Sequence, residues 1–217
     1  MRWSRFYYNA TMSRIDNQKY YNEVVVRHGV SAQGVHWNSQ ATQYKRFEVL
    51  LSLLDLDEHS NVVDVGCGFA DLYLYMQEKK IAFNSYIGLE VMESMVIEAH
   101  KRVDSEIRVA DVLFDTLPVA DYYICSGAMN ILTRDETYLF IQRCLNASKK
   151  GFVFNLLEGE DESMVYNYFR PNEIENIAKE LEVSYIMKRG YLPRDFTVLL
   201  TKQEGNSRKW NIGKISA

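Results

Sequence analysis

The chain has few cysteines, no long apolar run and no excess of basic residues. Its three cysteines, Cys67, Cys125 and Cys144, are an odd number and include no Cys-x-x-Cys pair, which argues against a disulfide framework and a zinc site. No stretch approaches the roughly 18 apolar residues of a membrane span. The 25 lysines and arginines against 29 aspartates and glutamates give a net charge of −4, so no nucleic-acid partner is expected. Without an apolar signal segment, the chain is predicted to be cytoplasmic.

The stretch Asn61–Asp71, which reads NVVDVGCGFAD, organises the rest of the chain. Its β-branched apolar run predicts a strand that is buried on both faces. Gly66 and Gly68 then predict a tight turn where the backbone can approach a ligand with no Cβ in the way. Residues 72–78 read as a helix. Strand, glycine turn and helix together predict a nucleotide-binding turn at the carboxyl end of a parallel strand.

The charged residues of this turn indicate which ligand it suits. A dinucleotide fingerprint would place a third glycine at the position of Asp71. A carboxylate in the first helical turn would repel a pyrophosphate at the helix N-terminus and would suit a cationic ligand. Asp64 adds a second carboxylate near the turn. A nicotinamide-dependent oxidoreductase on a similar sheet is therefore the less favoured alternative.

Strands and helices alternate along the chain, which predicts an α/β fold with a doubly wound, mostly parallel seven-stranded sheet. The turn 190–195 is too short for a helical crossover, so the final two strands should form an antiparallel hairpin. The strands are expected at 62–65, 85–89, 107–110, 120–125, 151–156, 183–189 and 196–201. The helices are expected at 16–27, 39–54, 72–78, 91–103, 133–146 and 172–181.

Three parts of the chain are distinguished by composition. Residues 1–40 are rich in aromatic and polar groups and predict an N-terminal helical segment that serves as a lid over the substrate. Residues 41–202 hold the alternating strands and helices of the main domain. Residues 203–217 form a polar tail.

The pattern Asp64-Val65-Gly66-Cys67-Gly68 resembles the first motif of class I S-adenosylmethionine-dependent methyltransferases, which have a Rossmann-like, seven-stranded fold. Ala70 stands where that family usually has a third glycine. The resemblance covers roughly residues 40–202. It implies S-adenosyl-L-methionine as cofactor, S-adenosyl-L-homocysteine as product, and methyl transfer to a small or medium-sized acceptor. The alternative is a non-catalytic S-adenosylmethionine-binding sensor or scaffold protein.

Acidic or small residues follow successive predicted strands, and the carboxyl ends of such strands meet at one edge of the sheet. The resemblance implies that Gly66, Cys67 and Gly68 line the methionine part and that Glu90, 22 residues after Gly68, holds the ribose. It further implies the following cofactor contacts: Asp111 and Val112 at the adenine, Val91 and Met92 on its face, and Ser126 and Gly127 near the sulfonium. A separate expectation is that the helix 38–54 carries Gln43 and Arg46 towards the methionine end of the cofactor.

The reacting group is less clearly marked than the cofactor site. The sequence shows no convincing Ser/His/Asp, Cys/His or metal constellation, so catalysis is expected mainly from proximity and exclusion of water. His36 is the first candidate base, because it lies in the loop before helix 39–54; His28, Tyr21 and Glu158 are the others. The acceptor molecule, its reacting atom and the oligomeric state are left open.

Overall fold

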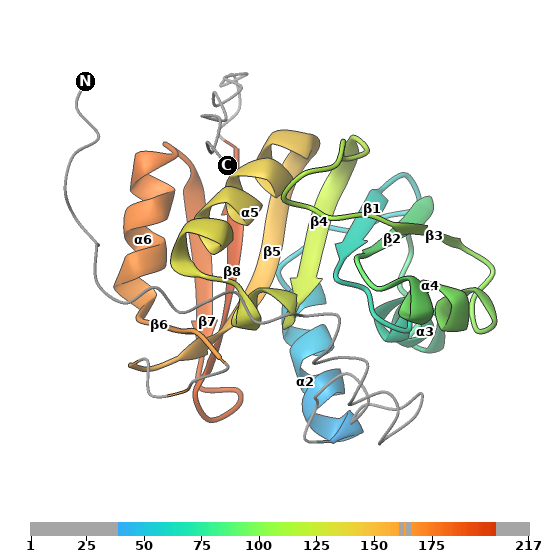
Figure 1. Ribbon diagram of the computed structural model, residues 1–217, viewed down its shortest axis with the longest axis horizontal. Helices are drawn as coiled ribbons and strands as arrows, with labels where there is room; N and C mark the ends of the chain where they lie inside the picture. Colours follow the sequence, from blue (N-terminus) through green and yellow to red (C-terminus); the bar gives the residue numbers. More distant parts are fainter. Residues whose placement is uncertain (1–38, 161–162, 164–165, 203–217) are drawn as a thin grey trace.

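A computed structural model of the protein describes residues 39–160, 163 and 166–202 (Figure 1). The strands are β1 (Asn61–Val65), β2 (Ser85–Glu90), β3 (Glu106–Val109), β4 (Ala120–Ser126), β5 (Ser148–Glu158), β6 (Tyr168–Phe169), β7 (Ser184–Arg189) and β8 (Asp195–Thr201). The helices are α2 (Gln40–Leu51), α3 (Asp71–Glu78), α4 (Glu93–His100), the 3-10 helix η2 (Ala128–Ile131), α5 (Arg134–Ala147) and α6 (Pro171–Glu180). The predicted helix 16–27, nearly all of the predicted lid and the polar tail lie outside the described residues, so these predictions stay untested.

The sheet has the order β3-β2-β1-β4-β5-β8-β7, which confirms the predicted α/β fold. Strands β1 to β5 pair in parallel, and β8 pairs antiparallel with both β5 and β7. Strand β6 was not predicted, because two residues are too few to leave an alternating pattern. It pairs with the end of β5, which runs two residues further than expected because β6 and β8 both bond to its last residues.

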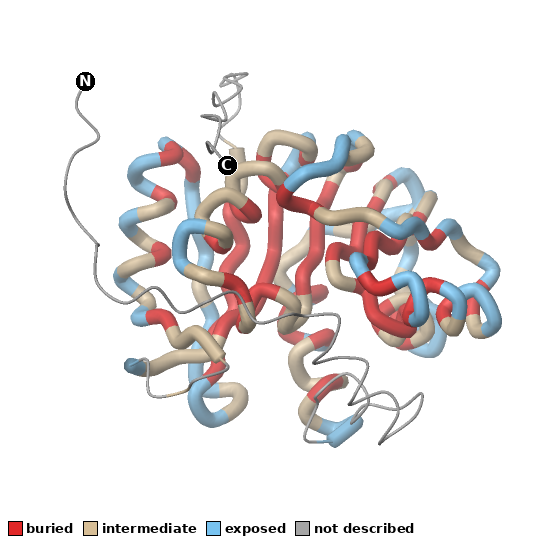
Figure 2. The backbone as a smooth tube through the Cα atoms, in the orientation of Figure 1, coloured by how far each residue is buried: buried red, intermediate tan, exposed pale blue. Residues whose placement is uncertain are grey.

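Helices cover both faces of the sheet. Residues of α5 and α6 pack with one set of strand side chains, and residues of α2, α3 and α4 pack with the set that points the other way. Figure 2 shows the result, with buried backbone along the central strands. Val62 and Val63 illustrate the alternation, since each is fully or almost fully buried but in opposite layers.

The two neighbours of β1 set the position of the ligand site. The chain leaves β1 towards β2 on one side and later returns to β4 on its other side. The strand order therefore reverses beside β1, and a crevice opens at the carboxyl ends of these strands. No described helix is long and apolar enough to cross a membrane.

Helix α2 is held to the sheet by a buried ion pair. Ser39 caps its first turn by accepting a hydrogen bond from the Thr42 amide at 3.2 Å. Arg46 Nε and Nη2 each lie 2.5 Å from Asp195 Oδ2 at the start of β8. The Asp195 side chain is completely buried, and the Tyr191 hydroxyl donates to its other oxygen. Burial raises the pKa of Asp195, and the nearby Arg46 lowers it.

Replacing Arg46 should therefore destabilise the fold strongly. In Arg46→Met the buried Asp195 carboxylate loses its cation, and the free energy of unfolding should fall by about 3–5 kcal/mol. Lys45→Met is the matched control, because Lys45 forms an exposed pair with Glu48 in the same helix and should change stability by at most about 1 kcal/mol. Urea unfolding followed by circular dichroism measures both. Similar small losses in the two variants would contradict the assigned role of the ion pair.

Candidate functional site

A cavity of about 340 Å³ lies at the carboxyl ends of β1, β2 and β4. All the residues predicted for the cofactor except Met92 line it: Arg46, Asp64, Gly66, Cys67, Gly68, Glu90, Val91, Asp111, Val112, Ser126 and Gly127. Gln43 lines it as well. The structure thus brings together residues that are spread over more than 80 positions of the sequence.

Met92 is not among the residues that line the cavity. It is buried in a small cluster with Phe69 and Met95, and Met95 lines the cavity instead. The Met92 amide donates to Glu90 Oε1 at 3.0 Å, which fixes the backbone just before α4 begins. The predicted contact of Met92 with the adenine face stays a prediction, and Met95, three residues further along the chain, is the methionine that lines the cavity.

The glycine turn is held against two other elements. The amides of Gly66 and Cys67 both donate to the Leu89 carbonyl of β2, at 2.8 and 3.1 Å. Gly66 has a φ of +74°, and a Cβ at this position would collide with the Cβ of Ala128. Ala70 takes a left-handed conformation with a φ of +60° and is completely buried. It therefore accepts a strain that glycine would avoid.

Glu90 is fixed by the backbone around it. Its Oε2 accepts a hydrogen bond from the Gly68 amide at 3.0 Å, and its Oε1 accepts the one from Met92. Glu90 is only 7% exposed. Burial raises the pKa of Glu90, and the backbone hydrogen bonds oppose that rise. The carboxylate is thus held in one orientation at the cavity wall.

Asp71 is paired rather than free. Its Oδ1 lies 2.7 Å from Arg102 Nη2, and its Oδ2 accepts a hydrogen bond from Gln43 Nε2 at 2.9 Å. Arg102 also donates to the Phe69 carbonyl. Arg102 balances much of the negative charge of Asp71. Asp71 therefore repels a phosphate less strongly than the sequence alone suggests. Arg102 was not singled out because nothing in its local sequence marks it as a partner of a residue 31 positions away.

Asp64 is a buried carboxyl group with a perturbed pKa. The residue is 2% exposed, and the Tyr86 hydroxyl donates to its Oδ2 at 2.6 Å. Burial raises the pKa of Asp64 to about 7, despite the opposing hydrogen bond from Tyr86. A cation at this part of the cavity would favour the ionised form.

Asp111 and Val112 form the wall after β3. Asp111 Oδ1 accepts a hydrogen bond from the Leu113 amide at 2.8 Å, and the Asp111 amide donates to Asp115 Oδ2 at 2.8 Å. These bonds hold a short turn that presents Val112, which is 5% exposed, to the cavity. An apolar wall beside a carboxylate at a strand end suits a heteroaromatic ring with polar edges.

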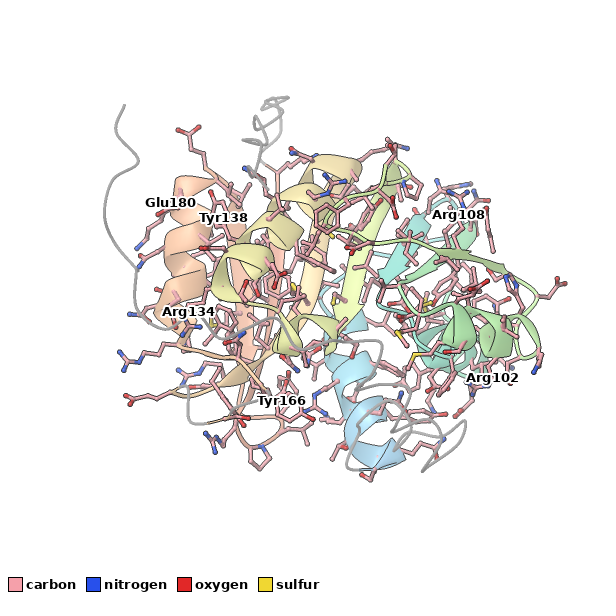
Figure 3. The ribbon with its side chains drawn as sticks, viewed as in Figure 1. Arg102, Arg108, Arg134, Tyr138, Tyr166 and Glu180 are labelled. Atoms are coloured by element: carbon pink, nitrogen blue, oxygen red, sulfur yellow. The ribbon has the colours of Figure 1, made fainter. Side chains whose placement is uncertain are left out.

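The turn after β4 is connected to the α2 ion pair. The Gly127 amide donates to Asn155 Oδ1 at 3.1 Å, and Asn155 Nδ2 donates to Asp195 Oδ1 at 3.4 Å. Sequence reasoning missed Asn155, since it lies inside the apolar run of β5. Tyr166 and Tyr168 line the cavity on this side. Figure 3 shows Tyr166 on the side of α2 towards β6 and Arg102 on its other side.

Most of the candidate bases lie outside the described residues. His36, His28 and Tyr21 lie outside the described residues, so their roles stay predictions. Glu158 is paired with Arg189 and is not among the residues that line the cavity, and its role as a base stays a prediction. Within residues 39–160, 163 and 166–202, no group of three or more His, Cys, Asp or Glu side chains could hold a metal ion.

Solved structures with this fold include several S-adenosylmethionine-dependent methyltransferases. Magnesium protoporphyrin IX methyltransferase from Synechocystis PCC 6803, solved with bound cofactor, is 15% identical, with 76% of this chain and 79% of that chain covered and a TM-score of 0.60. A methyltransferase from Clostridium acetobutylicum is 12% identical, with 83% and 98% covered and a TM-score of 0.60. Human N-acetylserotonin methyltransferase in complex with the cofactor is 15% identical, with 72% and 51% covered and a TM-score of 0.59.

Neither a protein-family model nor a curated protein matches the chain. Identities this low show a shared fold, and the fold is that of the class I methyltransferases.

The raised pKa of Asp64 predicts a pH-dependent stability. Between about pH 4 and pH 7 the unfolded chain releases a proton that the folded Asp64 retains, so folding becomes less favourable as the pH rises. Asp64→Asn keeps an oxygen for the Tyr86 hydroxyl and has no charge to bury. Its free energy of unfolding should exceed that of the wild type by an amount that grows across this window, on the order of 2–4 kcal/mol above pH 7. Urea unfolding at pH 5, 6, 7 and 8 tests this; a pH-independent difference would contradict it.

Proposed function

We propose that the protein is a methyltransferase that moves the methyl group of S-adenosyl-L-methionine to a small or medium-sized acceptor. The observation that supports it best is the cavity wall, where Asp64 in β1, Glu90 at the end of β2 and Asp111 after β3 lie beside a glycine turn. A sulfonium and an ammonium are cations, and ribose hydroxyls donate hydrogen bonds, so carboxylates are suitable partners for all three.

The residues present fit this cofactor. Gly66 lets the turn approach Ala128 of the segment after β4 more closely than any residue with a Cβ could. Glu90 is held by two amides and can accept from two adjacent hydroxyls of a ribose. Met95 and Val112 supply apolar surface for an adenine ring. The cofactor, when bound, supplies a methyl group on a sulfonium, which leaves as a neutral thioether.

The chain's own contribution to the reaction is mainly positioning. Glu90 and the glycine turn hold one reactant, and the residues after β4 hold the other next to it. Aligning two reactants can contribute about 7–11 kcal/mol, whereas a general base typically contributes a factor of about 10²–10⁴. Because the displacement has a good leaving group, the protein need not supply a nucleophile.

Binding of the cofactor is the first test of the proposal. The purified protein should bind S-adenosylmethionine and S-adenosylhomocysteine but not NAD in calorimetric titrations. Glu90→Ala should weaken that binding by about 1–3 kcal/mol, because charge-assisted hydrogen bonds to the ribose are lost. Glu93→Ala, at an exposed position of the first turn of α4, should leave the affinity unchanged. Unchanged affinity in Glu90→Ala would refute the ribose assignment.

Turnover distinguishes an enzyme from a cofactor-binding sensor or scaffold. An enzyme converts the cofactor to S-adenosylhomocysteine when it is given a metabolite extract, whereas a sensor binds it without consuming it. Mass spectrometry of the cofactor pool separates the two.

The predicted base His36 is tested by substitution. His36→Ala should lower the rate by at most about 10⁴-fold and leave cofactor affinity nearly unchanged, because proximity supplies most of the acceleration. His59→Ala is the control, since the His59 side chain is 83% exposed and pairs with Glu58 on the surface. Complete loss of turnover in His36→Ala with both ligands still bound would make His36 an essential base.

A further inference from the structure

The residues that line the cavity include charged side chains before β4 and none from the end of β4 to Tyr168. The charged residues that line it are Arg46, Asp64, Asp71, Glu90 and Asp111. The lining residues from position 126 to position 168, within the described part of the chain, carry no charge and are mostly apolar. The carboxylates lie on the half that suits the cofactor, so the uncharged half is the place for the acceptor.

Asn130 is the buried polar side chain of this uncharged half. It lies in η2, four residues after the end of β4, and is 8% exposed. Its Oδ1 is buried and has no hydrogen-bond partner among the described residues. Its carbonyl accepts a hydrogen bond from the Asn167 amide at 2.7 Å, which joins η2 to the segment that carries Tyr166 and Tyr168. Asn130 therefore lies between the turn after β4 and the part of the cavity wall that Tyr166 and Tyr168 form.

An unpartnered buried oxygen is costly, and a ligand with an N–H or O–H would remove that cost. Ser126 Oγ, at the end of β4 in the same wall, has no partner among the described residues either. Thr137 Oγ1 is a third such atom, but Thr137 lies in α5 and does not line the cavity. Position at the cavity distinguishes Asn130 and Ser126 from Thr137, and of these two residues Asn130 is the more deeply buried.

We propose that Asn130 positions the acceptor and that the acceptor is a neutral amine with an apolar body. This inference rests on the proposed function. The Asn130 carboxamide oxygen accepts a hydrogen bond from an N–H of the amine and directs the nitrogen lone pair at the methyl carbon. The apolar wall, which includes Leu132, Phe140 and Leu157, favours the uncharged form of an amine by desolvation.

The chemistry of an amine matches the groups that are present. As the nitrogen forms its bond to the methyl carbon, the carbon–sulfur bond breaks and sulfur keeps the electron pair. The nitrogen becomes an ammonium and afterwards releases a proton to water, so no base is needed at the moment of transfer. An alcohol would need a base at that moment, and because the Asn130 carboxamide cannot accept a proton at neutral pH, an alcohol would depend on another group such as the predicted base His36. A carboxylate acceptor would lose hydration against apolar walls, with no cation among the described lining residues from position 126 to position 168.

Binding to the protein saturated with S-adenosylhomocysteine tests the acceptor class. The probes are 2-phenylethylamine, N-methyl-2-phenylethylamine and a set of aliphatic amines, each compared with the alcohol and the carboxylate of the same skeleton. Calorimetry should show a preference for the amines. Their apparent affinity should rise about tenfold per pH unit between pH 7 and pH 9, because only the free base is competent to bind. With S-adenosylmethionine, mass spectrometry should detect N-methylated products.

Variants at Asn130 test the positioning role. Asn130→Leu should weaken amine binding and lower kcat/KM by a factor of about 10–100, with unchanged affinity for S-adenosylhomocysteine. Asn130→Asp keeps an acceptor and adds a charge, so amine binding should persist with a flatter pH dependence. Thr137→Val removes an unpartnered hydroxyl outside the cavity and should leave binding and turnover unchanged.

Any result other than the expected ones contradicts one specific part of the proposal. If S-adenosylhomocysteine does not bind, the proposed function itself fails. If it binds and the amines do not, or if alcohols or carboxylates are preferred, the acceptor class is wrong. If Asn130→Leu binds amines normally, or if Thr137→Val loses as much as Asn130→Leu, Asn130 does not position the acceptor. Should Asn130→Leu fail to fold, the pH dependence and selectivity of the wild type still decide the acceptor class.

Discussion

The close approach of three chain segments at Gly66 is the constraint on which the rest of the site depends. Two successive amides of the turn donate to one carbonyl of β2, and the Gly66 Cα faces the Cβ of Ala128 with no room for a side chain. This contact sets β1, β2 and the turn after β4 at fixed positions relative to one another. Residues from three different strand ends can then reach the same ligand, and none of them needs to move far to do so.

Burial gives the carboxylates of this site their properties. An exposed carboxylate would be ionised and screened by water, whereas Asp64 and Glu90 have little contact with solvent. Burial raises the pKa of both groups because their charged forms lose hydration. The hydrogen bond from the Tyr86 hydroxyl opposes this rise for Asp64, and backbone amides oppose it for Glu90. A cation in the cavity completes this balance. The site therefore stores an unfavourable free energy that a positively charged ligand relieves.

Local patterns in the sequence predicted most of the fold and many of the residues that line the cavity. Alternating or β-branched runs mark strands, and Gly66 marks the tight turn, because these signals act between near neighbours. Contacts between distant residues left no such signal. Arg46 and Asp195 are 149 positions apart, and the pairing of Asp71 with Arg102 changes the meaning of a charge that local sequence had suggested was free. That Met95 rather than Met92 lines the cavity left no local signal either, since side-chain direction at the start of a helix depends on how the preceding backbone is held.

The division of the cavity into a charged and an uncharged half follows from where the polar groups can be satisfied. Carboxylates at the ends of β1 to β3 find donors in the glycine turn, in the backbone after each strand, and in Tyr86. After β4 the comparable donor, the Gly127 amide, is already bound to Asn155. A carboxylate there would have to compete for that donor, so apolar side chains and single neutral polar groups are the stable choice. The distribution of hydrogen-bond donors that holds the carboxylates of β1 to β3 thus leaves the wall after β4 uncharged, with Asn130 as its buried polar side chain.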